Sequence, residues 1–154
     1  MCSRKLFALP FDTLPTREDF EKRVAAKGSD AYHAKKQIER LDRGENLMTE
    51  LPYSVQTWSF GDDLAMIFLP GEVVVDYSLR LKRECDGKKL WVNAYSNDVP
   101  CYIPSRRVWK EGGYEAAGAM LYYDRPTRLA PQVEELIIGA AREILPIQFQ
   151  RKTR

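Results

Sequence analysis

Histidine is nearly absent from this chain: its 154 residues include one, His33. A serine or cysteine nucleophile usually needs a histidine beside it as a base, so Ser105, in a Pro-Ser-Arg-Arg loop, has no partner of that kind. His33 falls on an expected surface helix, where we interpret it as structural or solvated. The three cysteines form no C-x-x-C pair and leave one over in any disulfide scheme, which indicates free thiols.

Long apolar runs are missing as well. No stretch approaches the roughly 18 apolar residues of a membrane-spanning helix, and the N-terminus has no apolar core of a signal peptide, so we expect a cytoplasmic chain without a transmembrane segment. The sequence contains no G-x-x-x-x-G-K-[ST], G-x-G-x-x-G, H-E-x-x-H or G-x-S-x-G motif. A net charge of +2 gives no support to a nucleic-acid partner.

What is present is ordinary for one soluble domain: 44% hydrophobic and 30% charged residues in 154 positions. We divide the sequence into a helical segment over 1–50, an α/β segment over 51–146 and a basic tail over 147–154. The tail carries Arg151, Lys152 and Arg154, and we interpret it as a solvated end.

Two amphipathic helices are expected before residue 50. Thr16 is expected to cap the first, which Gly28 ends. Ser29-Asp30 is expected to cap the second, which Gly44 ends. We assign no chemistry to either helix.

The hydrophobic period changes at Tyr53. Residues 53–60 alternate apolar and polar side chains, and residues 64–69 form a continuous apolar run after a Gly-Asp-Asp turn. The two segments together predict a β-hairpin.

A strand–helix–strand unit is expected to follow the hairpin. Residues 73–85 predict a helix despite three consecutive valines, and residues 89–95 predict a strand. Residues 120–123 are expected to be a short strand or extended stretch, and residues 129–145 predict an amphipathic helix between two prolines. The sequence therefore predicts an α/β fold, with a small mixed sheet packed with amphipathic helices.

Candidate chemistry lies just past the ends of the two buried strands. Glu72 follows a Pro-Gly turn and is expected to open a helix, so it is either a metal ligand or general base, or a carboxylate that stabilises the helix N-terminus. Tyr102 and Tyr114 lie in the irregular segment 96–118. Tyr102 can also be interpreted as an ordinary partly buried tyrosine with no functional role. The glycines before Tyr114 can likewise be interpreted as a simple turn. Asn97-Asp98 also fits simple turn chemistry.

In combination, these motifs resemble the neutral/alkaline, non-lysosomal ceramidase family, specifically the later part of its catalytic domain and bacterial ceramidase-like relatives. The resemblance covers roughly residues 51–145. It rests on Pro70-Gly71-Glu72, on Asn93-Ala94-Tyr95-Ser96-Asn97-Asp98 leading to Tyr102-Ile103-Pro104, and on Gly113-Tyr114-Glu115.

The resemblance implies a zinc-dependent amide hydrolase that cleaves the N-acyl bond of ceramide, with zinc held by two histidines, a glutamate and a tyrosine. Glu72 matches the glutamate ligand, Tyr102 the tyrosine ligand, and Tyr114 a tyrosine that hydrogen-bonds the scissile carbonyl. The histidine motifs belong to an earlier part of the family's domain, and His33 matches neither. The resemblance thus implies a partial catalytic domain, inactive as an isolated chain. Intact relatives are expected to be secreted or periplasmic.

A second hypothesis is a non-catalytic α/β binding module. A domain that is part of a larger core exposes an apolar face, which a partner chain or a second copy would cover. The expected partners are therefore an N-acyl lipid such as ceramide, if the site is active, and a polypeptide that covers the exposed face.

Overall fold

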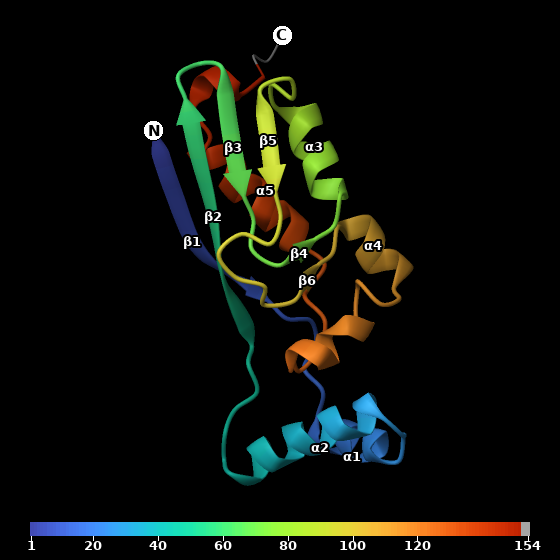
Figure 1. Ribbon diagram of the computed structural model, residues 1–154. Helices are drawn as coiled ribbons and strands as arrows, with labels where there is room; N and C mark the ends of the chain where they lie inside the picture. Colours follow the sequence, from blue (N-terminus) through green and yellow to red (C-terminus); the bar gives the residue numbers. More distant parts are fainter. Residues whose placement is uncertain (152–154) are drawn as a thin grey trace.

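A four-stranded sheet of order β1-β2-β3-β5 forms the centre of the fold in the computed structural model, which describes residues 1–151 (Figure 1). The first three strands are antiparallel, and β3 pairs with β5 in parallel. This confirms the α/β class, the mixed sheet and the hairpin. The strands span Cys2–Pro10 (β1), Glu50–Phe60 (β2), Leu64–Phe68 (β3) and Leu90–Asn93 (β5).

Strand β1 was not predicted, and it adds a β element to a segment for which the sequence suggested helices. Its inward positions include Ser3 and Lys5 as well as Phe7 and Leu9, so its alternation of apolar and polar residues is incomplete. The extended conformation of this segment is stabilised by pairing with β2 along the whole length of β1, and not by a regular alternation of residues.

The predicted helix over 73–85 is confirmed over most of its length, but its first three residues, 73–75, are not helical. Helix α3 spans Asp76–Glu84, while Glu72–Val73 forms the short strand β4. Strand β4 pairs in parallel with β6 (Tyr102–Ile103), which forms a second, two-stranded sheet. The β-branched valines favour extended backbone over helix, so Glu72 lies in a strand and does not open a helix.

Helices α1 (Arg17–Val24) and α2 (Ser29–Asp42) pack against each other, away from the main sheet (Figure 1). The expected Thr16 cap is confirmed: Thr16 and Asp19 form a reciprocal capping box. The second cap is wrong, because Gly28 occupies the N-cap of α2 without a side-chain bond and Asp30 pairs with Arg23 instead.

The C-terminal third is mostly helical. The predicted strand over 120–123 is wrong: Gly118–Tyr123 forms the 3₁₀ helix η1. The predicted amphipathic helix is confirmed as α5, which packs across the inner face of β1 and β2. The remaining elements are α4 (Arg106–Glu111), α5 (Val133–Ile144) and the 3₁₀ helix η2 (Ile147–Phe149).

The segment after α5 is not simply a solvated end. Phe149 is fully buried, and Gln150 forms a β-bridge with Cys85. Arg151 is exposed, as expected, whereas Lys152 and Arg154 lie outside the described residues. Within residues 1–151, no helix is long and apolar enough to cross a membrane.

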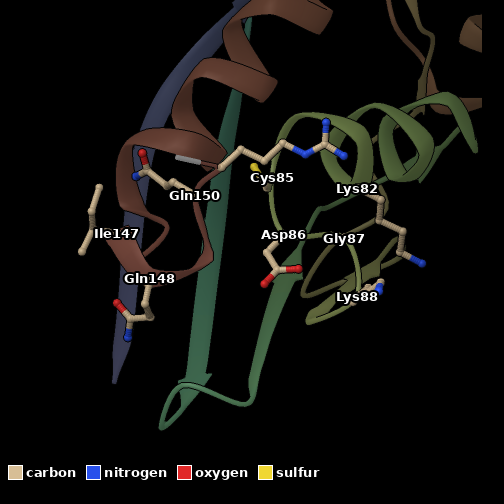
Figure 2. A pocket seen from close by; sticks show the side chains of 9 residues that line it. Lys82, Cys85, Asp86, Gly87, Lys88, Ile147, Gln148 and Gln150 are labelled. Carbon is tan, nitrogen blue, oxygen red and sulfur yellow. The ribbon is translucent and has the colours of Figure 1, made fainter. Parts of the chain in front are cut away.

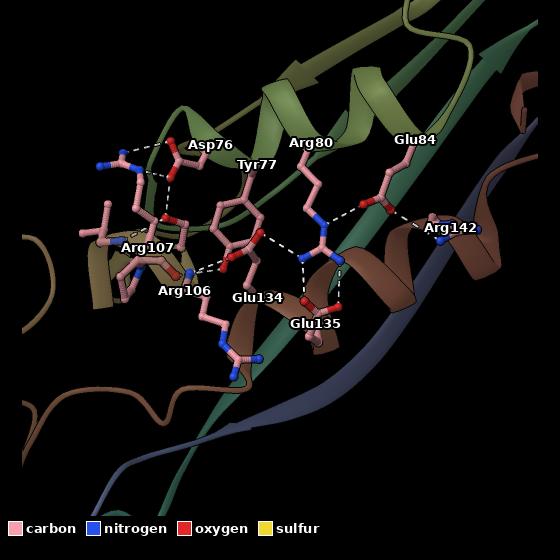
Figure 3. Close-up of polar contacts among 12 residues, drawn as sticks. Asp76, Tyr77, Arg80, Glu84, Arg106, Arg107, Glu134, Glu135 and Arg142 are labelled. Atoms are coloured by element: carbon pink, nitrogen blue, oxygen red, sulfur yellow. Dashed lines mark hydrogen bonds and ion pairs between the residues drawn. The ribbon is translucent and has the colours of Figure 1, made fainter. Parts of the chain in front are cut away.

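A polar network ties α3, α4 and α5 together (Figure 3). The Arg80 guanidinium donates to Glu134 at 2.9 Å and to Glu135 at 2.7 Å. The largely buried Glu134 also accepts from the backbone N–H of Arg106 at 2.6 Å. Because a buried carboxylate needs a cation and hydrogen-bond donors, this network fixes α4 against the core.

The outer face of the sheet carries no helix of the described chain (Figure 1). One row across this face is apolar on all four strands: Cys2, Trp58, Met66 and Trp91 occupy aligned positions. Trp58 is 44% exposed and Trp91 59% exposed. These apolar side chains are therefore partly exposed to solvent on a face that the described helices leave uncovered.

Candidate functional site

Two loops leave neighbouring parallel strands and meet at the same edge of the sheet. Residues 69–72 follow β3, and residues 94–98 follow β5. Backbone hydrogen bonds join the loops: the N–H of Gly71 donates to the backbone carbonyl of Asp98 at 2.8 Å, and the N–H of Tyr95 donates to the carbonyl of Gly71 at 3.0 Å. The carboxyl ends of adjacent parallel strands are where α/β folds place ligands.

Gly71 lets these loops approach closely. Its φ is +85°, and a Cβ there would lie 2.7 Å from the carbonyl oxygen of Cys101. Any other residue at this position would strain the backbone and push the loops apart. Gly71 therefore sets the position of Glu72, the next residue along the chain.

The carboxylate of Glu72 is surrounded by phenols. It accepts hydrogen bonds from the hydroxyls of Tyr123 and Tyr95, the latter at 2.9 Å. Tyr102 is the direct neighbour of Glu72 in the β4–β6 pairing, and its hydroxyl is close enough to contribute as well. Since each phenol donates to an anion, the arrangement stabilises an ionised carboxylate.

Tyr114 completes a group that we call the Glu72 cluster: Glu72, Tyr95, Tyr102, Tyr114 and Tyr123. The Tyr114 ring packs edge-on against the Tyr102 ring, with 5.7 Å between the centroids, and also lies beside Tyr122. Tyr114 is 52% exposed, and within residues 1–151 its hydroxyl forms no hydrogen bond. That hydroxyl is therefore free to donate to a ligand.

The ionisation of the cluster follows from these contacts. The phenols of Tyr123, Tyr102 and Tyr95 lower the pKa of Glu72. In return, the nearby carboxylate of Glu72 raises the pKa of Tyr102 to about 12, and it also raises the pKa of Tyr123. At neutral pH Glu72 therefore carries a negative charge, and Tyr102 and Tyr123 keep their protons.

The structure brings together all three residues that the sequence singled out. Glu72, Tyr102 and Tyr114 come from β4, β6 and the loop after α4. Sequence reasoning missed Tyr95 and Tyr123 as members. Tyr95 could have been found, because it follows β5 directly within the Asn-Ala-Tyr-Ser-Asn-Asp motif. Tyr123 carried no such signal.

The other candidates have structural roles. Asn97 adopts a left-handed φ of 69°, and the Asp98 carboxylate accepts from the N–H of Val99 at 2.8 Å, which is turn chemistry. Ser105 caps α4. His33 is 3% exposed, and its Nε2 donates to the carbonyl of Arg125 at 3.0 Å, which supports the structural interpretation.

The donors present do not make a complete zinc site. Catalytic zinc takes three protein ligands, usually imidazoles and carboxylates, and the cluster offers one carboxylate with phenols that keep their protons. No group of three His, Cys, Asp or Glu side chains converges within residues 1–151. His33 is committed to the carbonyl of Arg125 and lies outside the cluster. Imidazole ligands would have to come from another polypeptide segment.

A cavity of about 630 Å³ lies at the other end of the sheet, between α3 and η2 (Figure 2). The exposed Lys82 and Lys88 and the half-buried Asp86 line it, together with the buried Cys85. It contains none of the predicted site residues.

Comparisons with protein families, with curated proteins and with solved structures find no match to this chain.

Proposed function

We propose that this chain carries the carboxylate-and-phenol part of a ceramidase-like, zinc-dependent amide hydrolase site. The substrate class would be N-acylsphingosine or a related N-acyl amide, and the isolated chain would be inactive. The observation that carries the proposal is the convergence of Glu72 with Tyr102 through the β4–β6 pairing. Tyr114 lies against the same ring.

Each residue has a role that its surroundings support. Glu72 stays ionised at neutral pH because phenols lower its pKa, so it can hold a positive charge. Tyr114 keeps a free, exposed hydroxyl, which can donate to the oxygen of a scissile carbonyl as negative charge develops on it. Deleting one such donor typically costs about 3 kcal/mol of transition-state stabilisation. Bound zinc would supply an acidified water and polarise the carbonyl.

Free imidazole can test the site by replacing the missing histidine ligands. Zinc binding would be measured by calorimetry with and without imidazole. Hydrolysis of a fluorescent N-acylsphingosine would be measured under the same conditions. We expect weak or no zinc binding by the chain alone, and stronger binding when imidazole is present. Glu72→Gln should abolish the imidazole-supported binding, because an amide is a poor zinc ligand.

The matched control is Glu115→Gln, which removes an exposed carboxylate next to Tyr114 in sequence. It should bind zinc as the unmodified chain does. Equal zinc binding by Glu72→Gln and the unmodified chain would contradict the proposal, because the metal would then be held elsewhere.

The exposed face of the sheet favours a second candidate function, a non-catalytic interaction module. Trp58 and Trp91 lie in one apolar row on a face that no described helix covers. A partner chain or a second copy that covered this row would remove apolar surface from water. Sedimentation velocity across a range of protein concentrations tests self-association. A strict monomer that binds no hydrophobic dye would count against this function.

A further inference from the structure

Three tyrosine rings at or beside the Glu72 cluster are open to solvent. Tyr95 is 61% exposed, Tyr114 52% and Tyr122 63%. Tyr122 is not a member of the cluster, but the centroid of its ring lies 6.2 Å from that of Tyr114. Exposed aromatic surface beside an anion attracts a weakly hydrated cation, because the face of a tyrosine ring carries partial negative charge. We propose that the Glu72 cluster binds a quaternary ammonium ion such as choline.

The negative charge of Glu72 has no cation paired with it. Hydrogen bonds from the hydroxyls of Tyr95 and Tyr123 favour the ionised carboxylate, but they do not neutralise it. Within residues 1–151 Glu72 forms no ion pair, whereas the largely buried Glu134 pairs with Arg80. The cluster therefore presents an uncompensated negative charge to a ligand.

The ring faces are also free of the chain's own cations. Within residues 1–151, cation–π contacts occur only at the rings of Phe20, Tyr32 and Trp109. The Tyr102 and Tyr114 rings meet at 72° with their centroids 5.7 Å apart, and the Tyr122 ring is tilted by 47° from the Tyr114 ring. Rings at such angles form the walls of a corner, where one cation can lie within about 6 Å of more than one centroid.

The donors present favour a quaternary ammonium ion over a metal ion or a primary amine. The cluster offers one carboxylate and no histidine, cysteine or aspartate, so a metal ion would need ligands from another polypeptide segment. A primary ammonium carries three N–H donors, and the only charged acceptor in the cluster is Glu72. A quaternary ammonium has no N–H to satisfy, so the carboxylate and the ring faces are sufficient.

Charge around the cluster favours a free cation over the phosphocholine head group of a lipid. Within residues 1–151 no Lys or Arg side chain hydrogen-bonds to a member of the cluster. A phosphate on the ligand would therefore find no cationic partner and would be repelled by Glu72. This inference does not rest on the proposed function, although both use the negative charge of Glu72.

Calorimetry at constant ionic strength, with choline and its uncharged isostere 3,3-dimethylbutan-1-ol, would test the inference. Choline should bind roughly tenfold more tightly than the alcohol, because the two differ mainly in the positive charge. It should also bind more tightly than ethanolamine and phosphocholine. Absence of choline binding, or equal binding of choline and the alcohol, would overturn the inference. Tighter binding of phosphocholine would overturn the choice of a free cation.

Variants of exposed aromatic residues locate the binding without threatening the fold. Tyr114→Leu should weaken choline binding severalfold, while Tyr114→Phe, which keeps the ring, should retain it within about twofold. Phe60→Leu is the matched control, since Phe60 is 54% exposed and lies at the opposite end of β3 from Glu72. It should leave choline binding unchanged. Equal choline binding by Tyr114→Leu and the unmodified chain would overturn the assignment.

Zinc and choline binding, measured on the same protein, separate this inference from the proposed function. Glu72→Gln should weaken choline binding roughly tenfold, because it removes the negative charge of the cluster. Choline binding without imidazole-supported, Glu72-dependent zinc binding would leave the cation site standing and remove the hydrolase. Zinc binding of that kind without choline binding would remove the cation site and leave the hydrolase.

Discussion

The hydroxyl of Tyr123 donates a hydrogen bond to the carboxylate of Glu72, which joins the 3₁₀ helix η1 to strand β4. The two residues lie 51 positions apart in the sequence. Their contact closes the Glu72 cluster on the side opposite Tyr95, which donates to the other carboxylate oxygen. Tyr123 therefore positions the carboxylate as well as favouring its ionised form.

Replacing Tyr123 with Phe should raise the pKa of Glu72 towards its ordinary value, because the largest contribution to the lowered pKa is lost. We expect a stability loss of about 1 kcal/mol, as is typical for one hydrogen bond. A carboxyl-carbon NMR titration would follow Glu72. Tyr122→Phe is the matched control, since Tyr122 does not bond to Glu72. An unchanged Glu72 titration in Tyr123→Phe would contradict the contact.

His33 should make the folded state less stable in mild acid. Burial lowers its pKa, with a further contribution from the charge of Arg23, so the unfolded chain binds the proton more readily than the folded one. This stability is fully present above the ordinary histidine pKa of about 6.5 and falls as pH drops below it. Urea unfolding at pH 7.5 and 5.5 measures the difference, on protein without a histidine tag.

His33→Gln is the control, because it removes the only imidazole in the chain. Its stability should change less between the two pH values. Equal pH dependence in both proteins would assign the effect to another group.

Removing Arg80 should destabilise the fold by about 2 kcal/mol. Arg80→Met leaves the largely buried Glu134 without its cation, and breaking a buried pair is costly. Arg107→Gln is the comparison: Arg107 pairs with Asp76 and Glu111, but its side chain is 60% exposed, so the loss should stay under about 1 kcal/mol. Urea midpoints at constant m-value measure both. Equal losses of stability in Arg80→Met and Arg107→Gln would contradict the prediction, because burial of the ion pair would then not determine how much its removal destabilises the fold.

Replacing Gly71 with Ala should disturb the cluster more than the sheet. A Cβ at this position would lie 2.8 Å from a side-chain carbon of Ile103, in β6, so the β4–β6 pairing must shift. We expect a loss of about 1–3 kcal/mol, in line with strain at a special backbone position. Amide NMR shifts should change around Tyr102 and Glu72. Gly112→Ala, also at positive φ but in open space, is the control.

Periodicity predicted the hairpin and α5 because both elements are long enough for a repeat to show. It could not predict β4 or β6, since two-residue strands have no period, and only the pairing of Glu72 with Tyr102 defines them. The same limit applies to Tyr123. Its place beside Glu72 depends on how η1 packs, which no local pattern of residues encodes.

Glu72, Tyr102 and Tyr114 could be singled out from the sequence because they follow apolar strands and lie within short polar motifs. Glu72 follows β3 after a Pro-Gly turn, and topology then brings it next to the end of β5. The contacts among these residues and the lowered pKa of Glu72 could not be predicted from the sequence, because the phenols around Glu72 come from separate segments of the chain.

The β4–β6 ladder is two residues long and separate from the main sheet, so it has few hydrogen bonds of its own. Short segments of this kind open at a fraction of the global unfolding free energy. On warming, the arrangement around Glu72 should therefore come apart while the four-stranded sheet is still intact. Hydrogen exchange at the backbone N–H of Val74, which donates to the carbonyl of Ile103, should then run ahead of exchange at Val55.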